Sequence, residues 1–133
     1  MRLLVTGWRD WPAEHAYVVW AVLQAIHERR PVTLLIHGDC PYGGVDVYAQ
    51  SWAQQRGVPW QAVPARRSRG GYLLGAERNT KMVRDGADEC VGFPGPESRG
   101  SWDCLRKAVD AGIQLAGVIG WWPGIPDAYR APA

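Results

Sequence analysis

Short apolar runs alternate along this chain with longer stretches in which apolar residues recur at helical spacing, and this alternation restricts the fold more than any other feature. The runs of strand length are residues 3–5, 32–37, 58–63, 88–93 and 113–119, and the helical stretches are residues 12–30, 45–56, 76–84 and 101–111. Parallel neighbours in a sheet need crossover connections, and these are usually helices. The pattern therefore predicts an α/β fold, a single Rossmann-like domain with a mostly parallel five-stranded sheet flanked by helices.

Individual residues add detail to this prediction. Pro59 and Pro64 flank the third apolar run, and because proline in a sheet is confined to edge positions, we expect that strand at the rim. The helical spacing over residues 101–111 predicts that this helix buries four apolar side chains, Trp102, Leu105, Ala108 and Val109.

Length and composition limit the classes of protein to which the chain can belong. Its 133 residues fit one domain, which we assign to residues 1–120, with residues 121–133 as a proline-containing C-terminal tail. No uncharged apolar run reaches the roughly 18 residues of a membrane span, so no membrane partner is expected. Three cysteines without C-x-x-C spacing argue against a disulfide framework and favour a reducing, cytoplasmic location. A net charge of +2 counts against nucleic acid as the partner.

Glycines gather where three of the predicted strands end. Thr6-Gly7 follows the first strand, Gly38 with Gly43-Gly44 follows the second, and Gly95 with Gly100-Ser101 follows the fourth. Ligands of open parallel sheets bind at the carboxyl ends of the strands. Glycine lets backbone amides approach an anion, and a helix start offers unpaired N–H groups, so these loops predict a phosphate-bearing ligand. The alternative is that the glycines only shape tight turns.

The order and spacing of several short motifs carry a family resemblance. Neither G-x-G-x-x-G nor G-x-x-x-x-G-K-[ST] occurs, which excludes a standard dinucleotide fingerprint and a P-loop. The chain instead resembles the YspA-like branch of the SLOG superfamily from residue 2 to residue 119. The motifs that carry this resemblance are Thr6-Gly7-Trp8-Arg9-Asp10, His37-Gly38-Asp39-Cys40-Pro41 to Asp46, Gly75-Ala76-Glu77-Arg78-Asn79 with Met82, Phe93-Pro94-Gly95, and Gly100-Ser101-Trp102-Asp103.

The resemblance implies a site that handles nucleotides. The wider superfamily includes the Lonely Guy phosphoribohydrolases, which cleave the N-glycosidic bond of nucleoside monophosphates, ligand-binding sensor domains, and the DNA-processing A protein, which binds single-stranded DNA. By this resemblance Arg78 and Asp103 take the catalytic positions, and Gly95, Gly100 and Ser101 bind phosphate. Members of the superfamily often form dimers, so a homodimer is expected.

Departures from the phosphoribohydrolase motif favour binding over hydrolysis. Pro96 to Arg99 replace its second glycine and spacer, and Asp103 is one methylene shorter than the glutamate of that motif. A nucleotide-binding or nucleotide-sensing module is therefore the first hypothesis, an N-glycosidase the second, and a binder of single-stranded nucleic acid the third. The expected ligand-binding residues are Thr6, Gly7, Trp8, Arg9, Gly38, Gly43, Gly44, Asp46, Asn79, Gly95, Gly100 and Ser101.

Other features keep two interpretations open. Residues 65–75, with Arg66, Arg67 and Arg69, are expected to form a mobile loop lying over the surface, either solvated or acting as a clamp on a phosphate or on nucleic acid. Trp121-Trp122 either covers a sheet edge or mediates self-association. No cofactor is expected, and no metal, because His37, Asp39, Cys40 and Asp46 lie near each other in the sequence without a second histidine. Cys40 is also a conceivable nucleophile near a helix start.

Overall fold

The computed structural model describes residues 1–123, and it confirms the predicted α/β architecture. The strands are β1 (Arg2–Gly7), β2 (Leu34–His37), β3 (Trp60–Ala62), β4 (Glu89–Phe93) and β5 (Gln114–Val118). They form one sheet in the order β3-β2-β1-β4-β5, and every pair is parallel. The helices are the 3₁₀ turn η1 (Ala13–His15), α1 (Ala16–Arg29), α2 (Val45–Arg56), α3 (Gly75–Asp85) and α4 (Arg99–Asp110).

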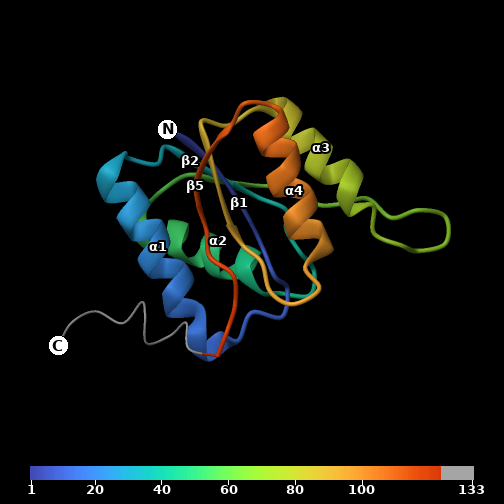
Figure 1. Ribbon diagram of the computed structural model, residues 1–133, viewed down its shortest axis with the longest axis horizontal. Coiled ribbons are helices and arrows are strands. Elements are labelled where there is room, and N and C mark those ends of the chain that lie inside the picture. The colour runs from blue at the N-terminus through green and yellow to red at the C-terminus, as the bar shows by residue number, and fades with distance from the viewer. Residues whose placement is uncertain (124–133) are drawn as a thin grey trace.

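The sheet is the middle layer of three, with α1 and α2 on one face and α3 and α4 on the other (Figure 1). Successive side chains of β1 supply both cores, as the pleat of a strand requires. Leu3 and Val5 pack with buried residues of α1 and α2, whereas Leu4 packs with buried residues of α3 and α4. A strand buried on both faces reads as a continuous apolar run, which explains why the first strand shows no polar alternation.

The chain reverses its direction across the sheet between β1 and β4. From β1 it runs outward through β2 to β3, which pairs only with β2 and lies at the rim as the two prolines predict. It then crosses back to β4, which pairs with β1 from Leu3↔Glu89 to Gly7↔Phe93. The crossovers on either side of this pair leave toward opposite faces. Such a switch point opens a crevice at the carboxyl ends of the strands.

The buried face of α4 differs from the predicted one. Leu105 and Ala108 are buried, but Trp102 is 46% exposed and Val109 is 53% exposed, so the prediction that these two are buried was wrong. The helix packs on α3 as well as on the sheet, and its buried stripe is Ser101, Cys104, Leu105 and Ala108. Three of these four side chains are small enough to fit where α4 meets both α3 and the sheet, and the larger Trp102 lies outside this contact.

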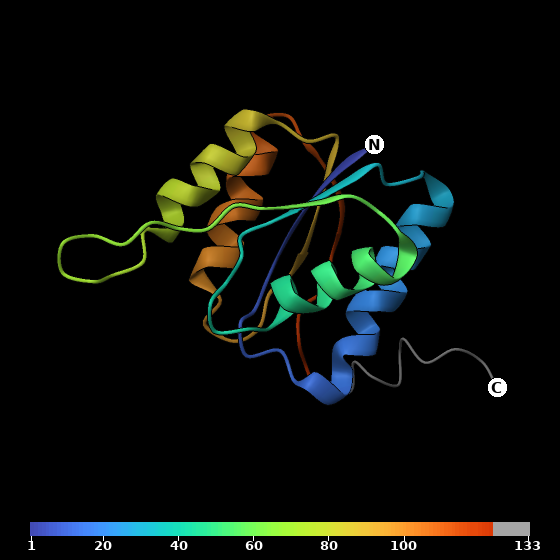
Figure 2. The same ribbon diagram turned by 180° about the vertical axis from the view of Figure 1, so that it is seen from behind.

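Residues 65–74 form a hairpin that projects from the body of the molecule (Figures 1 and 2). An isolated antiparallel bridge joins Arg67 to Leu73, the Ser68 N–H donates to the Tyr72 carbonyl over 2.8 Å, and Gly71 closes the turn at φ +83°. Tyr72, near the tip, is 77% exposed. The prediction of a loop lying over the surface was therefore wrong, because the segment satisfies its backbone groups within itself.

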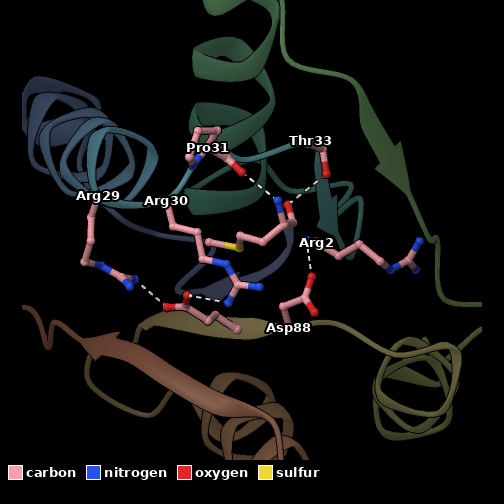
Figure 3. A network of polar contacts seen from close by, with 8 residues as sticks. Arg2, Arg29, Arg30, Pro31, Thr33 and Asp88 are labelled. Carbon is pink, nitrogen blue, oxygen red and sulfur yellow. Dashed lines mark hydrogen bonds and ion pairs between the residues drawn. The ribbon is translucent and has the colours of Figure 1, made fainter.

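A polar network occupies the amino ends of the strands, opposite the crevice (Figure 3). Glu89 of β4 is 2% exposed and accepts hydrogen bonds from Arg29 over 2.5 Å and from Arg30 over 3.4 Å. Asp88 accepts the Arg2 backbone N–H over 2.7 Å, and this bond holds the pKa of Asp88 below its ordinary value. These charged groups are paired with one another, so the polar network at this end of the sheet has a structural role.

The C-terminal tail is described only in part. Trp121 packs on the first core, with its ring 5.5 Å from that of Trp11, whereas Trp122 is 44% exposed. The rest of the predicted tail, residues 124–133, lies outside the described residues. None of the helices described over residues 1–123 has the length and apolar character to cross a membrane.

Candidate functional site

A cavity of about 700 Å³ lies at the carboxyl edge of the sheet, at the switch point between β1 and β4. Its volume falls within the range of small-molecule sites. The loops after β1, β2 and β4, the base of the hairpin and the first turns of α3 and α4 form its walls. The predicted site residues that line it are Thr6, Gly7, Trp8, Arg9, Gly38, Asp46, Arg78, Asn79, Gly100 and Ser101, and those that do not are Gly43, Gly44, Gly95 and Asp103.

Several of the glycines allow the cavity walls to pack against one another. A Cβ atom on Gly7 would lie 2.5 Å from Cβ of Val45 at the start of α2. A Cβ atom on Gly44, whose φ is +79°, would overlap the backbone carbonyls of Trp8 and Arg9, and one on Gly95 would overlap the Trp8 indole. These positions therefore need glycine for contacts within the protein, whatever the ligand.

Arg78 is anchored at the centre of the site. Its guanidinium Nη1 donates to the Gly38 carbonyl, and its Nε donates to Asn79 Oδ1 over 2.9 Å. A Cβ atom on Gly38 would overlap this guanidinium, so the missing side chain at Gly38 makes the anchor available. Arg78 also lines the cavity, where a fixed planar cation suits a phosphate or carboxylate.

The loop that carries Gly38 is held by a buried histidine. His37 is 1% exposed, its Nδ1 accepts the Asp39 backbone N–H over 2.9 Å, and its Nε2 lies 2.8 Å from Gln50 Oε1. Because Nδ1 accepts, Nε2 carries the proton and donates to Gln50. Asp39 takes a φ of +49°, which this bond supports. Both ring nitrogens are thus occupied, and residues 1–123 contain no group of three or more His, Cys, Asp or Glu side chains arranged to hold a metal.

Asp103 belongs to a polar link between α3 and α4. Asn79 Nδ2 donates to Asp103 Oδ2 over 3.1 Å and to the Gly100 carbonyl over 3.0 Å, and Lys107 Nζ donates to the same Asp103 oxygen over 2.8 Å. Burial raises the pKa of Asp103, but the hydrogen bonds from Lys107 and Asn79 outweigh it and hold that pKa below its ordinary value. Asn79 therefore connects Arg78 to Asp103, while the Asp103 carboxylate forms an ion pair with Lys107.

Asp46 is a buried acid that lines the cavity. It is 7% exposed, and its Oδ2 accepts the Cys40 backbone N–H over 3.1 Å. Burial raises the pKa of Asp46, although the positive charge of Arg78 and the hydrogen bond from the Cys40 N–H act in the opposite direction. A buried carboxyl of raised pKa in a cavity is typical of functional sites. Burial also raises the pKa of the Cys40 thiol, which counts against Cys40 as a nucleophile.

The charges around the cavity favour an anion. The N-termini of α2, α3 and α4 all meet it through Asp46, Gly75, Gly100 and Ser101, and helix N-termini carry partial positive charge. The charged lining residues are Arg9, Asp10, Asp39, Asp46, Arg67, Arg78, Glu97 and Arg99. These are four arginines and four acids, and because burial disfavours the ionised form of Asp46, the balance shifts from neutral toward positive.

Two arginines of this lining, Arg67 and Arg99, were not among the expected ligand-binding residues, although a phosphate clamp was one of the two interpretations of the run that contains Arg67. Arg99 is the first residue of α4, and Arg67 reaches the cavity from the hairpin, where it also donates to the Gly71 carbonyl over 2.8 Å. The signal for Arg67 was present in the basic run of residues 66–69. Its neighbour Arg66 points elsewhere and forms a two-pronged ion pair with Glu77, with bonds of 2.5 and 2.8 Å.

Comparison with known proteins adds two findings. A family model described as the YspA, cpYpsA-related SLOG family matches residues 1–70, which include Gly7, Gly38 and Asp46. The gene 61 protein of Mycobacterium phage D29 is 37% identical over 120 residues, a region that covers 86% of this chain and 93% of the phage protein. No solved structure matches the chain significantly.

Proposed function

Since this chain belongs to the YspA, cpYpsA-related SLOG family, we propose that it binds a nucleotide or nucleotide-derived ligand in the cavity at the carboxyl edge of its sheet. The single observation that carries this proposal is the convergence of three helix N-termini and the anchored Arg78 guanidinium on one cavity. Backbone N–H groups and a bidentate cation together are the groups that proteins use to hold phosphate.

The lining supplies a partner for each part of a nucleotide. Gly100 and Ser101 in the first turn of α4, with Arg78, would take the phosphate. Asp46 would accept or donate a hydrogen bond at a ribose hydroxyl, because its buried carboxyl has only the Cys40 N–H as a hydrogen-bond partner among the described residues. Trp8, which rests on Gly95, would offer an indole surface to the base.

Cleavage of an N-glycosidic bond is the second candidate, and the buried Asp46 carboxyl favours it. Such cleavage develops positive charge on the sugar, which a carboxylate can stabilise or use to activate water. The family resemblance gave this role to Asp103 with Arg78. Asp103 forms an ion pair with Lys107 outside the cavity lining, whereas Asp46 lines the cavity beside Arg78, so both acids enter the test.

The test follows thermal stability and released free base in the same incubations. The panel contains nucleoside monophosphates, cyclic nucleotides and ADP-ribose, with the matching nucleosides as controls that lack phosphate. A ligand at about 100 times its Kd adds about 2.7 kcal/mol of stability, which raises Tm by roughly 10 °C in a domain of this size. We expect at least one phosphorylated ligand to do so and its nucleoside to have a smaller effect.

Variants then separate binding from hydrolysis. Arg78→Ala should abolish most of the stabilisation. Any release of base that is lost in Asp46→Asn but retained in Asp103→Asn assigns the reaction to Asp46, and the reverse pattern assigns it to Asp103. Stabilisation without release supports binding alone. If no member of the panel raises Tm, the proposed function is wrong.

A further inference from the structure

One peptide unit takes part in two contacts at the edge of the cavity. The Gly38 carbonyl that accepts from Arg78 and the Asp39 N–H that donates to His37 Nδ1 belong to the same peptide bond. This bond is trans, and in a trans peptide the C=O and N–H groups point in opposite directions within one plane. Whatever holds the Asp39 N–H on one side therefore directs the Gly38 carbonyl to the other side, toward Arg78.

The backbone alone does not favour this orientation of the peptide. Asp39 has a φ of +49°, in the left-handed region that residues with a side chain adopt at an energetic cost. Rotation of the peptide plane by half a turn would return Asp39 to a negative φ. It would also turn the Asp39 N–H toward the Arg78 cation and take the carbonyl away from it. The observed orientation is therefore maintained by the hydrogen-bond partners of the peptide.

His37 can accept the Asp39 N–H only while its Nδ1 atom carries no proton. Nε2 of the same ring lies 2.8 Å from Oε1 of Gln50 on α2. Since Oε1 is an acceptor, it holds the ring proton on Nε2 and leaves Nδ1 free to accept. With the proton on Nδ1 instead, two donors would face each other between His37 and Asp39. Gln50 thus selects the tautomer that the peptide orientation requires.

The surroundings of His37 leave the ring few alternatives. It is 1% exposed, and the Trp60 ring of β3 stacks on it with centroids 6.2 Å apart. A buried polar group that loses its partner cannot replace that partner with bulk water. If the acceptor at Gln50 is lost, a change of tautomer is the response that remains open to His37.

We propose that Gln50 is a positioning residue for Arg78: by selecting the His37 tautomer, it orients the Gly38–Asp39 peptide that holds the guanidinium in the cavity. Gln50 and His37 lie outside the lining of this cavity. Moreover, α2 covers the face of the sheet opposite α3, which carries Arg78 (Figure 1). The inference goes beyond the proposed function because control of the anion-binding group lies outside the cavity. Its effect on ligand affinity rests on the proposed function, whereas the position of Arg78 does not.

The position of Arg78 can be measured by NMR without a ligand. Its Nε–H donates to Asn79, so its signal should differ from those of solvated arginines, and loss of the signal in Arg78→Lys identifies it. Gln50→Leu removes the acceptor and should move this signal to the position of solvated arginines. The nitrogen chemical shifts of His37 in the unmodified protein should place the ring proton on Nε2.

Calorimetric titration with adenosine monophosphate measures the consequence for binding. Gln50→Leu should weaken Kd roughly tenfold, as expected for the loss of one positioned charge-assisted hydrogen bond. In the Gly38→Ala background, where a Cβ atom already displaces Arg78, the same change should have no further effect, because both variants act on one contact. Gln55→Leu, at an exposed position of the same helix, is the matched control and should change neither Kd nor the Arg78 signal.

Gln50→Glu provides a readout that a loss of packing would not give. Its carboxylate keeps an acceptor opposite Nε2, but it also favours the imidazolium form of His37, in which Nδ1 carries a proton as well. The ratio of its Kd to that of the unmodified protein should be near one at about pH 9 and should rise toward that of Gln50→Leu at about pH 6. The nearby Asp46 is common to both proteins and cancels in this ratio.

The outcomes separate this inference from the proposed function. If Gln50→Leu leaves the Arg78 signal unchanged, or if the ring proton of His37 lies on Nδ1, the inference is wrong whatever the ligand does. It is also wrong if Arg78 is displaced but the affinity for adenosine monophosphate does not change. If Arg78 is displaced as expected and the unmodified protein does not bind the nucleotide, the positioning of Arg78 by Gln50 stands and the failure lies with the proposed function.

Discussion

Replacing Gly38 by alanine should move Arg78 without removing its charge. The Gly38 backbone lies outside the left-handed region, so alanine itself is tolerated there, but its Cβ atom would overlap the guanidinium of Arg78. Those atoms are the far end of a flexible side chain and can swing aside. The hydrogen bonds to the Gly38 carbonyl and to Asn79 are then lost, while water solvates the freed cation.

The structure sets different magnitudes for folding and for binding. A typical hydrogen bond contributes about 1 kcal/mol net, so we expect Gly38→Ala to lower the free energy of unfolding by about 1–2 kcal/mol. A positioned charge-assisted hydrogen bond to an anion is worth about 1.5–3 kcal/mol, which corresponds to a roughly 10- to 150-fold weaker Kd. The expected loss of binding free energy is therefore somewhat larger than the expected loss of stability.

Calorimetric titration of the nucleotide that stabilises the protein checks this expectation. Gly57→Ala is the control, because Gly57 has a φ of +67° and nothing near its missing Cβ, so this variant should lose about 1 kcal/mol of stability and no affinity. If Gly38→Ala binds like the unmodified protein while Arg78→Ala does not, the carbonyl anchor does not position Arg78. If both bind normally, Arg78 does not contact the ligand.

Three further variants test the structure elsewhere. Asp46→Asn should raise Tm at pH 7, because burial raises the pKa of Asp46 and the folded protein loses stability as pH rises through that pKa. Calorimetry should show that the gain in Tm vanishes near pH 4, and an equal gain in Tm at both pH values would contradict this reasoning. Glu89→Ala should lower the free energy of unfolding by about 2 kcal/mol in urea titrations, less than the roughly 3–5 kcal/mol of a fully buried pair because Arg29 is half-exposed, and an unchanged midpoint would show that the pair does not stabilise the fold. Gly44→Ala should cost about 3 kcal/mol, since it meets backbone, whereas Gly43→Ala, which meets open space, should cost about 1 kcal/mol; equal losses in the same assay would refute the packing role of Gly44.

The fold was predictable because it depends on which side chains are buried, and buried apolar residues recur in the sequence at the spacing of helices and strands. Runs such as Leu3 to Val5 are apolar throughout because both faces of the central strands are covered. The buried face of α4 was harder to predict. This helix packs on the sheet and on α3 at once, and it buries small residues such as Ser101 that a hydrophobic pattern does not identify. The hairpin escaped prediction because its one bridge pair, Arg67 and Leu73, leaves too short a pattern to recognise in the sequence.

The location of the site was predictable, whereas its chemistry was only partly so. Parallel strands bring their carboxyl ends to one edge, so Thr6, Gly38 and Ser101 had to lie near one another. The Asp103–Lys107 ion pair was visible as i,i+4 spacing and was overlooked. The burial of Asp46 was not readable, because it depends on how the start of α2 docks on the loop after β1 through Gly44.

The packing role of Gly7, Gly44 and Gly95 separates the frame of the site from its chemistry. Any mutation of these glycines disturbs the walls, whereas a change at Asp46, Arg67 or another lining side chain alters what the cavity recognises. A sequence motif built on these glycines would therefore identify proteins whose pockets share a shape, whichever ligands those proteins bind. The same separation makes this domain a convenient starting point for altering ligand preference by design, with the glycines held fixed.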